Sequence, residues 1–156
     1  MSAVPNATVM GPRTPGRVCQ VLLVEDNPGD VRLTQEAFKA GAIKVRLTVA
    51  ADGVEAMDIL NQQGIHARTP RPDLVLLDLN LPKKTGIEVL YEIKADNELK
   101  RIPVIVMTTS KATQDVLRAY NLNANCYISK PVDLDDFLNV VRSIEDFWLT
   151  VVTLSD

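Results

Sequence analysis

The fold is decided by the stretch Val21-Leu22-Leu23-Val24-Glu25-Asp26-Asn27-Pro28. Its first four residues are a continuous apolar run, which is typical of a strand that helices cover on both faces. Two acids follow the run. Asn27 then suits a helix cap, and Pro28 suits the first helical position. An apolar strand that leads through acids into a helix predicts a βαβ arrangement with a parallel sheet.

The same alternation of strand and helix recurs along the chain. Apolar residues return with the 3.6-residue period in the helical windows, for example at Ile87, Leu90 and Ile93. The predicted strands cover about 21–24, 44–49, 74–77, 104–107 and 125–128. The predicted helices cover about 28–40, 53–60, 87–93, 111–120 and 134–144. We therefore expect an α/β fold with five strands and five helices.

Strand character predicts the order of the strands. The first, third and fourth strands are nearly continuous apolar runs, which places them inside the sheet. The second, Lys44-Val45-Arg46-Leu47-Thr48-Val49, alternates between polar and apolar residues. Its alternation predicts an edge strand, and the short fifth strand fits the other edge. These positions agree with the doubly wound order 2-1-3-4-5.

Length and composition indicate one globular domain. The chain has 156 residues, a net charge of −3 and 46% hydrophobic residues. No basic face for nucleic acid is expected at this charge, and no apolar run approaches the ~20 residues of a membrane span. Residues 1–17, rich in Pro and Gly, are predicted to be disordered. Residues 18–146 form the domain, and 147–156 form an apolar C-terminal tail. Without a secretory signal, the predicted location is the cytoplasm.

The histidine and cysteine content excludes several chemistries. His66 is the only histidine and is predicted to be a solvated loop residue. Triads and multi-histidine metal sites are thereby excluded. Cys19 and Cys126 show no metal-ligand spacing and are predicted to be reduced core thiols.

Polar residues end four of the predicted strands. Glu25 and Asp26 follow the first strand, Asp78 the third, Thr108 the fourth, and Lys130 the fifth. Because parallel strands end at one edge of a sheet, these residues are expected to lie together. Isolated helix caps would explain Asp26 alone but not the whole set. Three carboxylates in one place repel each other, and oxygen ligands favour a hard cation such as Mg²⁺.

Lys130 and Thr108 have a role if Asp78 accepts a phosphoryl group. A carboxylate oxygen then attacks phosphorus and forms an aspartyl phosphate. The charge of the transferred group lies on its equatorial oxygens. Mg²⁺, the Lys130 ammonium and the Thr108 hydroxyl would each hold one of these oxygens.

These residues resemble the receiver domains of two-component response regulators, a family with the CheY-like, flavodoxin-like fold. The resemblance covers about Val18 to Asp146 and rests on the motifs Val24-Glu25-Asp26-Asn27, Leu77-Asp78-Leu79-Asn80-Leu81-Pro82, Gly86, Thr108-Thr109 and Lys130-Pro131.

The resemblance implies roles for individual residues. Asp78 would be the phosphoacceptor. Asp26 would ligate Mg²⁺ directly, Glu25 would act mainly through a bound water, and the backbone carbonyl of Asn80 would be a further ligand. Lys130 would contact the phosphate.

A switch is also implied by the resemblance. Phosphorylation would draw the Thr108 hydroxyl inward, and the ring of Tyr127 would turn into the space it leaves. The output surface would be the face formed by the helix at 111–120, the strand at 125–128 and the helix from 134.

The apolar ending Phe147-Trp148-Leu149-Thr150-Val151-Val152-Thr153-Leu154 leaves no room for a DNA-binding output domain, so a stand-alone regulator is expected. Together with Asn27-Pro28-Gly29-Asp30-Val31-Arg32-Leu33, it is similar to the single-domain regulators of phytochrome-type histidine kinases. That resemblance implies a histidine kinase partner, and homodimerisation through the output face and the tail. The tail could equally fold back on its own domain.

Three other functions share parts of this pattern. A haloacid-dehalogenase-type phosphatase needs an acid two residues after its nucleophile, where this chain has Asn80. A flavin-binding electron carrier needs a phosphate loop after the first strand, where Glu25 and Asp26 would repel phosphate. An interaction module with an inactive site would not need Lys130. We therefore expect no enzyme acting on other molecules, but a protein that catalyses only its own phosphorylation and dephosphorylation.

Overall fold

The computed structural model describes residues 7–10, 18–108, 126–130 and 133–155; within these ranges, the side chains of 7–10, 108, 126, 127, 129 and 149–155 are outside the description. One sheet contains six strands in the order β1-β3-β2-β4-β5-β6. The strands are β1 (Ala7–Met10), β2 (Cys19–Val24), β3 (Val45–Ala50), β4 (Leu74–Asp78), β5 (Val104–Thr108) and β6 (Cys126–Ser129). The helices are α1 (Pro28–Lys39), α2 (Gly53–Leu60), α3 (Gly86–Ala95) and α5 (Leu134–Ser155), with 3-10 turns η1 (Gly64–His66) and η2 (Leu99–Arg101).

The predicted doubly wound order is confirmed. Strands β3, β2, β4, β5 and β6 pair in parallel, which is the predicted order 2-1-3-4-5. Every residue of the central strand β4 is buried, as its continuous apolar run predicts. The helix predicted at 111–120 lies outside the described residues.

The first segment of the chain differs from its prediction. Residues 1–17 were expected to be disordered, but Ala7–Met10 forms β1 and pairs antiparallel with β3. The sheet is therefore mixed, and β3 is not an edge strand. Alternation in β3 reflects the partial exposure of Arg46 on one face. The alternation of side chains does not show whether the backbone N–H and C=O groups along the edge of β3 are paired. These groups can still bind another strand.

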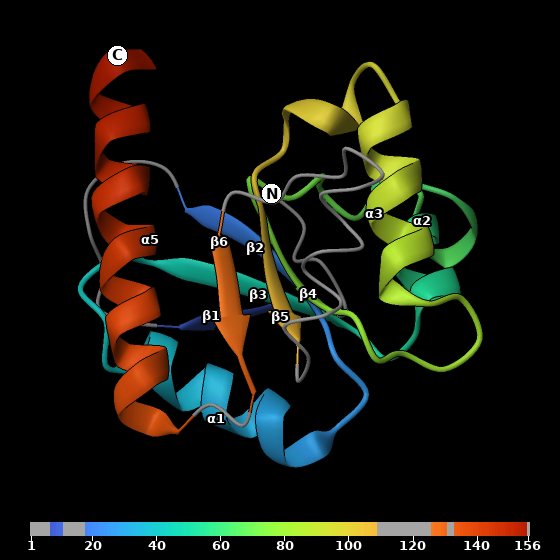
Figure 1. Ribbon diagram of the computed structural model, residues 1–156. Coiled ribbons are helices and arrows are strands. Elements are labelled where there is room, and N and C mark those ends of the chain that lie inside the picture. Colours follow the sequence, from blue (N-terminus) through green and yellow to red (C-terminus); the bar gives the residue numbers. More distant parts are fainter. Residues whose placement is uncertain (1–6, 11–17, 109–125, 131–132, 156) are drawn as a thin grey trace.

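Helices cover both faces of the sheet, with α1 and α5 on one side and α2 and α3 on the other (Figure 1). Each side has its own apolar cluster. On the α1 and α5 side, Phe38, Phe137 and Trp148 pack with inward residues of the strands. On the other side, Leu60 and Leu90 pack with the alternate strand residues. The sheet therefore separates two cores. The edge at which its parallel strands have their carboxyl ends lies between them.

Local sequence determines where the helices start. Asn27 caps α1, because its side chain accepts a hydrogen bond from the backbone N–H of Asp30 at 3.1 Å, and Pro28 occupies the first turn. Asp52 caps α2 in the same way, accepting from the N–H of Glu55 at 2.8 Å. The cap at Asn27 was predicted from the sequence.

The last helix continues beyond the predicted end of the domain. No break occurs between Asp146 and Phe147, because α5 runs on to Ser155. Trp148 is 4% exposed and belongs to the core beside α1, whereas Phe147 is 42% exposed. Helix α5 therefore crosses the predicted boundary at 146, and the start of the apolar tail covers its own domain. None of the described helices combines the length and apolar character that a membrane span requires.

His66 was predicted to be solvated, and that prediction was wrong. Its side chain is buried in η1, with Nδ1 3.3 Å from the Thr69 hydroxyl and Nε2 3.6 Å from a carboxylate oxygen of Glu55. The Gly and Pro residues of this loop predicted a turn correctly. They did not indicate that the turn folds against α2, where Thr69 and Glu55 provide polar neighbours.

Candidate functional site

Strand register brings the predicted polar residues to one edge of the sheet. Val24 pairs with Leu77, and Asp78 pairs with Met107 on the next strand. The acids that follow β2 and the acid that ends β4 therefore lie side by side. Thr108 and Ser129 are paired at the ends of β5 and β6, so Lys130 follows at the same edge.

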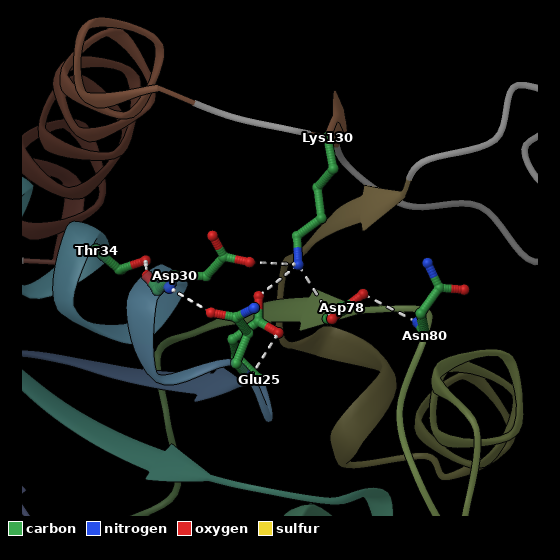
Figure 2. A network of polar contacts seen from close by, with 7 residues as sticks. Glu25, Asp30, Thr34, Asp78, Asn80 and Lys130 are labelled. Carbon is green, nitrogen blue, oxygen red and sulfur yellow. Dashed lines mark hydrogen bonds and ion pairs between the residues drawn. The ribbon is translucent and has the colours of Figure 1, made fainter.

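Lys130 forms the centre of the site (Figure 2). Its Nζ lies 2.6 Å from Glu25 Oε1, 3.1 Å from Asp78 Oδ2 and 3.1 Å from Asp30 Oδ2. Glu25 and Asp78 are almost fully buried, while Asp30 is about one-third exposed. One ammonium thus donates to three carboxylates, one directly after β2, one in the first turn of α1 and one at the end of β4.

The backbone orients the Asp78 carboxylate. Oδ1 accepts a hydrogen bond from the N–H of Asn80 at 2.9 Å, and Oδ2 accepts from Lys130. The N–H of Leu79 continues the ladder to the carbonyl of Met107 at 3.1 Å. Both oxygens of Asp78 are therefore held in place, at the floor of a cleft of about 360 Å³ lined by Glu25, Asp26, Asn27, Asp30, Asp78, Asn80 and Lys130.

Burial and charge shift the pKa values of two of these groups. Burial raises the pKa of Glu25 to about 7, and hydrogen bonding with Asp78 and the charge of Asp78 act in the same direction, while Lys130 opposes them. Burial lowers the pKa of Lys130, but hydrogen bonds to Glu25 and Asp30 and the charge of Asp78 outweigh it. The pKa of Lys130 is therefore raised above its usual value of 10.5, and the ammonium stays charged.

The acids fit a divalent cation. Glu25, Asp26 and Asp78 each offer a carboxylate oxygen, and these oxygens lie within 4.8 Å of one another. Asp26 is exposed, so the group is accessible from solvent. Four carboxylates, including that of Asp30, line this cleft together with one ammonium, which leaves an excess of negative charge. An oxygen-only set with this charge suits Mg²⁺ or a similar hard ion.

Four predicted site residues come together here: Glu25, Asp26, Asp78 and Lys130. Asn80 is placed beside Asp78 through its N–H, while a ligand role for its carbonyl stays a prediction. The backbone of Thr108 and Tyr127 lies in β5 and β6, but their side chains are outside the description. The predicted switch therefore stays a prediction.

Sequence reasoning did not find Asp30. The residue follows the cap residue Asn27 by three positions and reads as an ordinary acid in the first turn of a helix. A signal was nevertheless present: the third helical position lies over the cap and therefore faces the strand end that carries Glu25. The raised density of acids at 25, 26 and 30 could have indicated it.

The chain matches known proteins over most of its length. Residues 21–142 match the model of the response regulator receiver domain. Response regulator Rcp1 of the cyanobacterium Synechocystis sp. (strain PCC 6803) is 52% identical over 134 residues, which cover 86% of this chain and 91% of that protein.

Solved structures show the same similarity. The phosphorylated cyanobacterial phytochrome response regulator RcpA is 48% identical with a TM-score of 0.76, and the match covers 86% of this chain and 96% of RcpA. The Mn²⁺-bound form of response regulator Rcp1 is 51% identical with a TM-score of 0.73, covering 84% of this chain and 94% of that one.

Proposed function

This chain belongs to the response regulator receiver domain family, and from that premise we propose that it accepts a phosphoryl group on Asp78 from a histidine kinase. The observation that carries the proposal is the Asp78 carboxylate itself. It is buried, held at Oδ1 by the N–H of Asn80, and faced at Oδ2 by the Lys130 ammonium. A nucleophile held beside a cation, in an open cleft, suits phosphoryl transfer.

The transfer is a displacement at phosphorus. An oxygen of Asp78 forms the new P–O bond, the P–N bond of the kinase phosphohistidine breaks, and the imidazole nitrogen keeps the electron pair. Lys130 lies within hydrogen-bond distance of Asp78 and would donate to a phosphoryl oxygen. The Thr108 hydroxyl would donate to another.

We also propose Mg²⁺ as the cofactor, held by Glu25, Asp26, Asp78 and the backbone carbonyl of Asn80. When bound, the ion would neutralise charge on the transferring phosphoryl group. The proximity of the three carboxylates supports this assignment, and the related Rcp1 was solved with Mn²⁺. Hydrolysis at the same centre would return Asp78, so the chain is a substrate and catalyst of its own modification and not an enzyme acting on others.

The kinase is proposed to be phytochrome-type, and this protein is proposed to be cytoplasmic. Support comes from the 48% identity to a phytochrome response regulator. The chain also covers 91% of Rcp1, so that relative is hardly longer than one receiver domain.

Phosphorylation is proposed to act on the face that includes β6, α5 and the predicted helix at 111–120, through Thr108 and Tyr127. A second copy of the chain is the proposed occupant of this face. The exposed ring of Phe147 on α5 supports that choice, because it borders an apolar groove of about 330 Å³ together with Val140 and Ile144.

Intact-mass measurement tests the proposed chemistry. Incubation with acetyl phosphate and Mg²⁺ should add one phosphoryl group, and EDTA should prevent the addition. Asp78→Asn should remove the adduct completely, since it removes the attacking carboxylate. Asp58→Asn, a change on α2 outside the cleft, serves as the control and should keep the adduct. An adduct that persists in Asp78→Asn would contradict the proposal.

A further inference from the structure

Asp30 reaches the site from a helix. It lies in the first turn of α1, and its Oδ2 is 3.1 Å from the Lys130 Nζ (Figure 2). The carboxylates that lie close enough together to share a cation are those of Glu25, Asp26 and Asp78. Asp30 is not one of them. Asp30 therefore contacts the ammonium without belonging to the candidate ligand set.

The backbone of Asp30 is fixed independently of Lys130. Its N–H donates to the cap side chain of Asn27 at 3.1 Å, and its carbonyl accepts from the hydroxyl of Thr34 at 2.8 Å. Thr34 is 1% exposed, which fixes that hydroxyl within the packed side of α1. The helix thus fixes the backbone from which the Asp30 carboxylate extends, through contacts that do not involve the ammonium.

The three carboxylates that contact Lys130 would change differently during the proposed reaction. An ammonium has three donors, and here they face the carboxylates of Glu25, Asp30 and Asp78. A bound cation would compete for Glu25 and Asp78, and phosphorylation would convert Asp78 into an acyl phosphate. Of the three, the carboxylate of Asp30 alone is outside both changes.

From this arrangement we infer that Asp30 is a positioning residue: it holds the Lys130 ammonium beside Asp78 while the other two carboxylates engage the cation and the phosphoryl group. The inference rests on the proposed phosphorylation of Asp78. It assigns to α1 a part in the phosphoryl site that goes beyond the two acids, the phosphoacceptor, the hydroxyl and the lysine.

Three variants of α1 test the inference. Asp30→Asn should slow phosphorylation by acetyl phosphate about five- to tenfold, the size expected from the loss of a partly exposed charged contact. Asp30→Glu keeps the charge and should recover most of the rate. Glu36→Gln removes an exposed acid of the same helix that pairs with Lys39 at 3.7 Å, and it should leave the rate unchanged.

A double-mutant cycle separates positioning from general charge effects. If Asp30 acts through Lys130, Asp30→Asn should have almost no further effect on the rate in a Lys130→Ala background. A full five- to tenfold effect in that background would overturn the inference, and so would an Asp30→Asn rate equal to that of Glu36→Gln.

The ¹⁵N spectrum of the lysine ammonium groups gives a readout that needs no phosphorylation. The Lys130 signal, assigned with Lys130→Arg, should be protected from exchange with water in the unmodified protein, both without and with Mg²⁺. Asp30→Asn should abolish the protection in Mg²⁺, and a signal that stays protected would overturn the inference. A parent chain that takes no phosphoryl group would contradict the proposed function instead, and this spectrum would still decide whether Asp30 holds Lys130.

Discussion

Glu25 is the least exposed of the described acids, and its pKa is raised. It is 1% exposed, and its pKa is raised to about 7 by burial and by the neighbouring Asp78. Its usual value is 4.5, so the folded protein binds this proton more tightly than the unfolded chain does. Stability from this group is fully present below pH 4.5 and is lost as the pH rises through about 7. The loss is about 3 kcal/mol for a shift of this size.

Lys130 does not contribute to that change. Its pKa is raised, so its stabilising effect is present below its usual value of 10.5 and is lost only as the pH rises further. Between pH 5 and 8 the ammonium is charged in both the folded and the unfolded states.

We therefore predict that the melting temperature of the metal-free protein falls between pH 5 and 8, by about 6–12 °C from Glu25. Calorimetry across this range measures it. Glu25→Gln should lose this part of the pH dependence, and Mg²⁺ at pH 8 should restore the stability of the parent protein, since a cation replaces the proton. Equal slopes for the parent and Glu25→Gln would contradict the prediction.

Among single residues, the sequence predicted those at the ends of strands and missed Asp30 in the first turn of a helix. Glu25, Asp26, Asp78 and Lys130 could be found because parallel strands end together, a rule that needs no side-chain detail. Asp30 escaped because its contact with Lys130 spans 100 positions in the chain and depends on the orientation of one helical turn.

Helix α3 begins against the backbone of Asp78. Gly86 begins this helix, and a Cβ at Gly86 would lie 2.4 Å from the carbonyl oxygen of Asp78 and 2.4 Å from Leu79 Cα. The N–H of Gly86 donates to the carbonyl of Leu79 at 3.3 Å. The first turn of α3 therefore packs directly on the backbone that carries the phosphoacceptor.

Gly86→Ala is predicted to lower the free energy of unfolding by about 2–3 kcal/mol, because backbone atoms must move to accept the methyl group. Since the displaced backbone is that of Asp78, phosphorylation by acetyl phosphate should slow as well. Urea unfolding and intact-mass kinetics measure the two effects.

Gly64→Ala provides the comparison. Gly64 has a φ of +60° but no atom within 4 Å of an added Cβ. The change should cost about 1 kcal/mol through backbone strain alone and leave the phosphorylation rate unchanged. A Gly86→Ala protein as active as Gly64→Ala would show that α3 does not position Asp78.

The sheet illustrates a different limit of sequence patterns. Apolar runs predicted the inner strands and their order, because burial on two faces demands them. The strand β1 had no such pattern: it pairs through backbone groups, which every residue except proline provides. A short segment between flexible-looking Pro and Gly residues was therefore predicted as disordered, although Ala7–Met10 closes the edge of β3.

For the whole molecule, α5 connects the domain core to the proposed partner surface. Trp148 packs into the cluster beside α1, and Phe147, its neighbour in the chain, is exposed. The carboxylate of Glu145 also accepts from the N–H of Ala42 at 2.9 Å, which fastens α5 to the loop after α1. Of these two adjacent residues, Trp148 therefore stabilises the fold, and Phe147 lies on the proposed dimer surface.

The two residues should separate these properties. Trp148→Ala should lower the free energy of unfolding by about 3–5 kcal/mol, as expected for a large buried side chain. Phe147→Ala should change stability by no more than about 0.5 kcal/mol but weaken self-association. Chemical unfolding and sedimentation velocity measure the two. An unchanged dimer fraction in Phe147→Ala would contradict the proposed dimer surface.

The position of Trp148 has a further consequence. It is the only tryptophan in the chain, and its indole lies in the apolar cluster on the side of the sheet that α1 and α5 cover. Ultraviolet emission excited at the red edge of protein absorption therefore originates from a single place in each molecule. Its wavelength and its quenching by small solutes report how α5 is seated against the domain. The protein thus carries an optical probe of the helix through which the signal is proposed to leave, with no label or substitution needed.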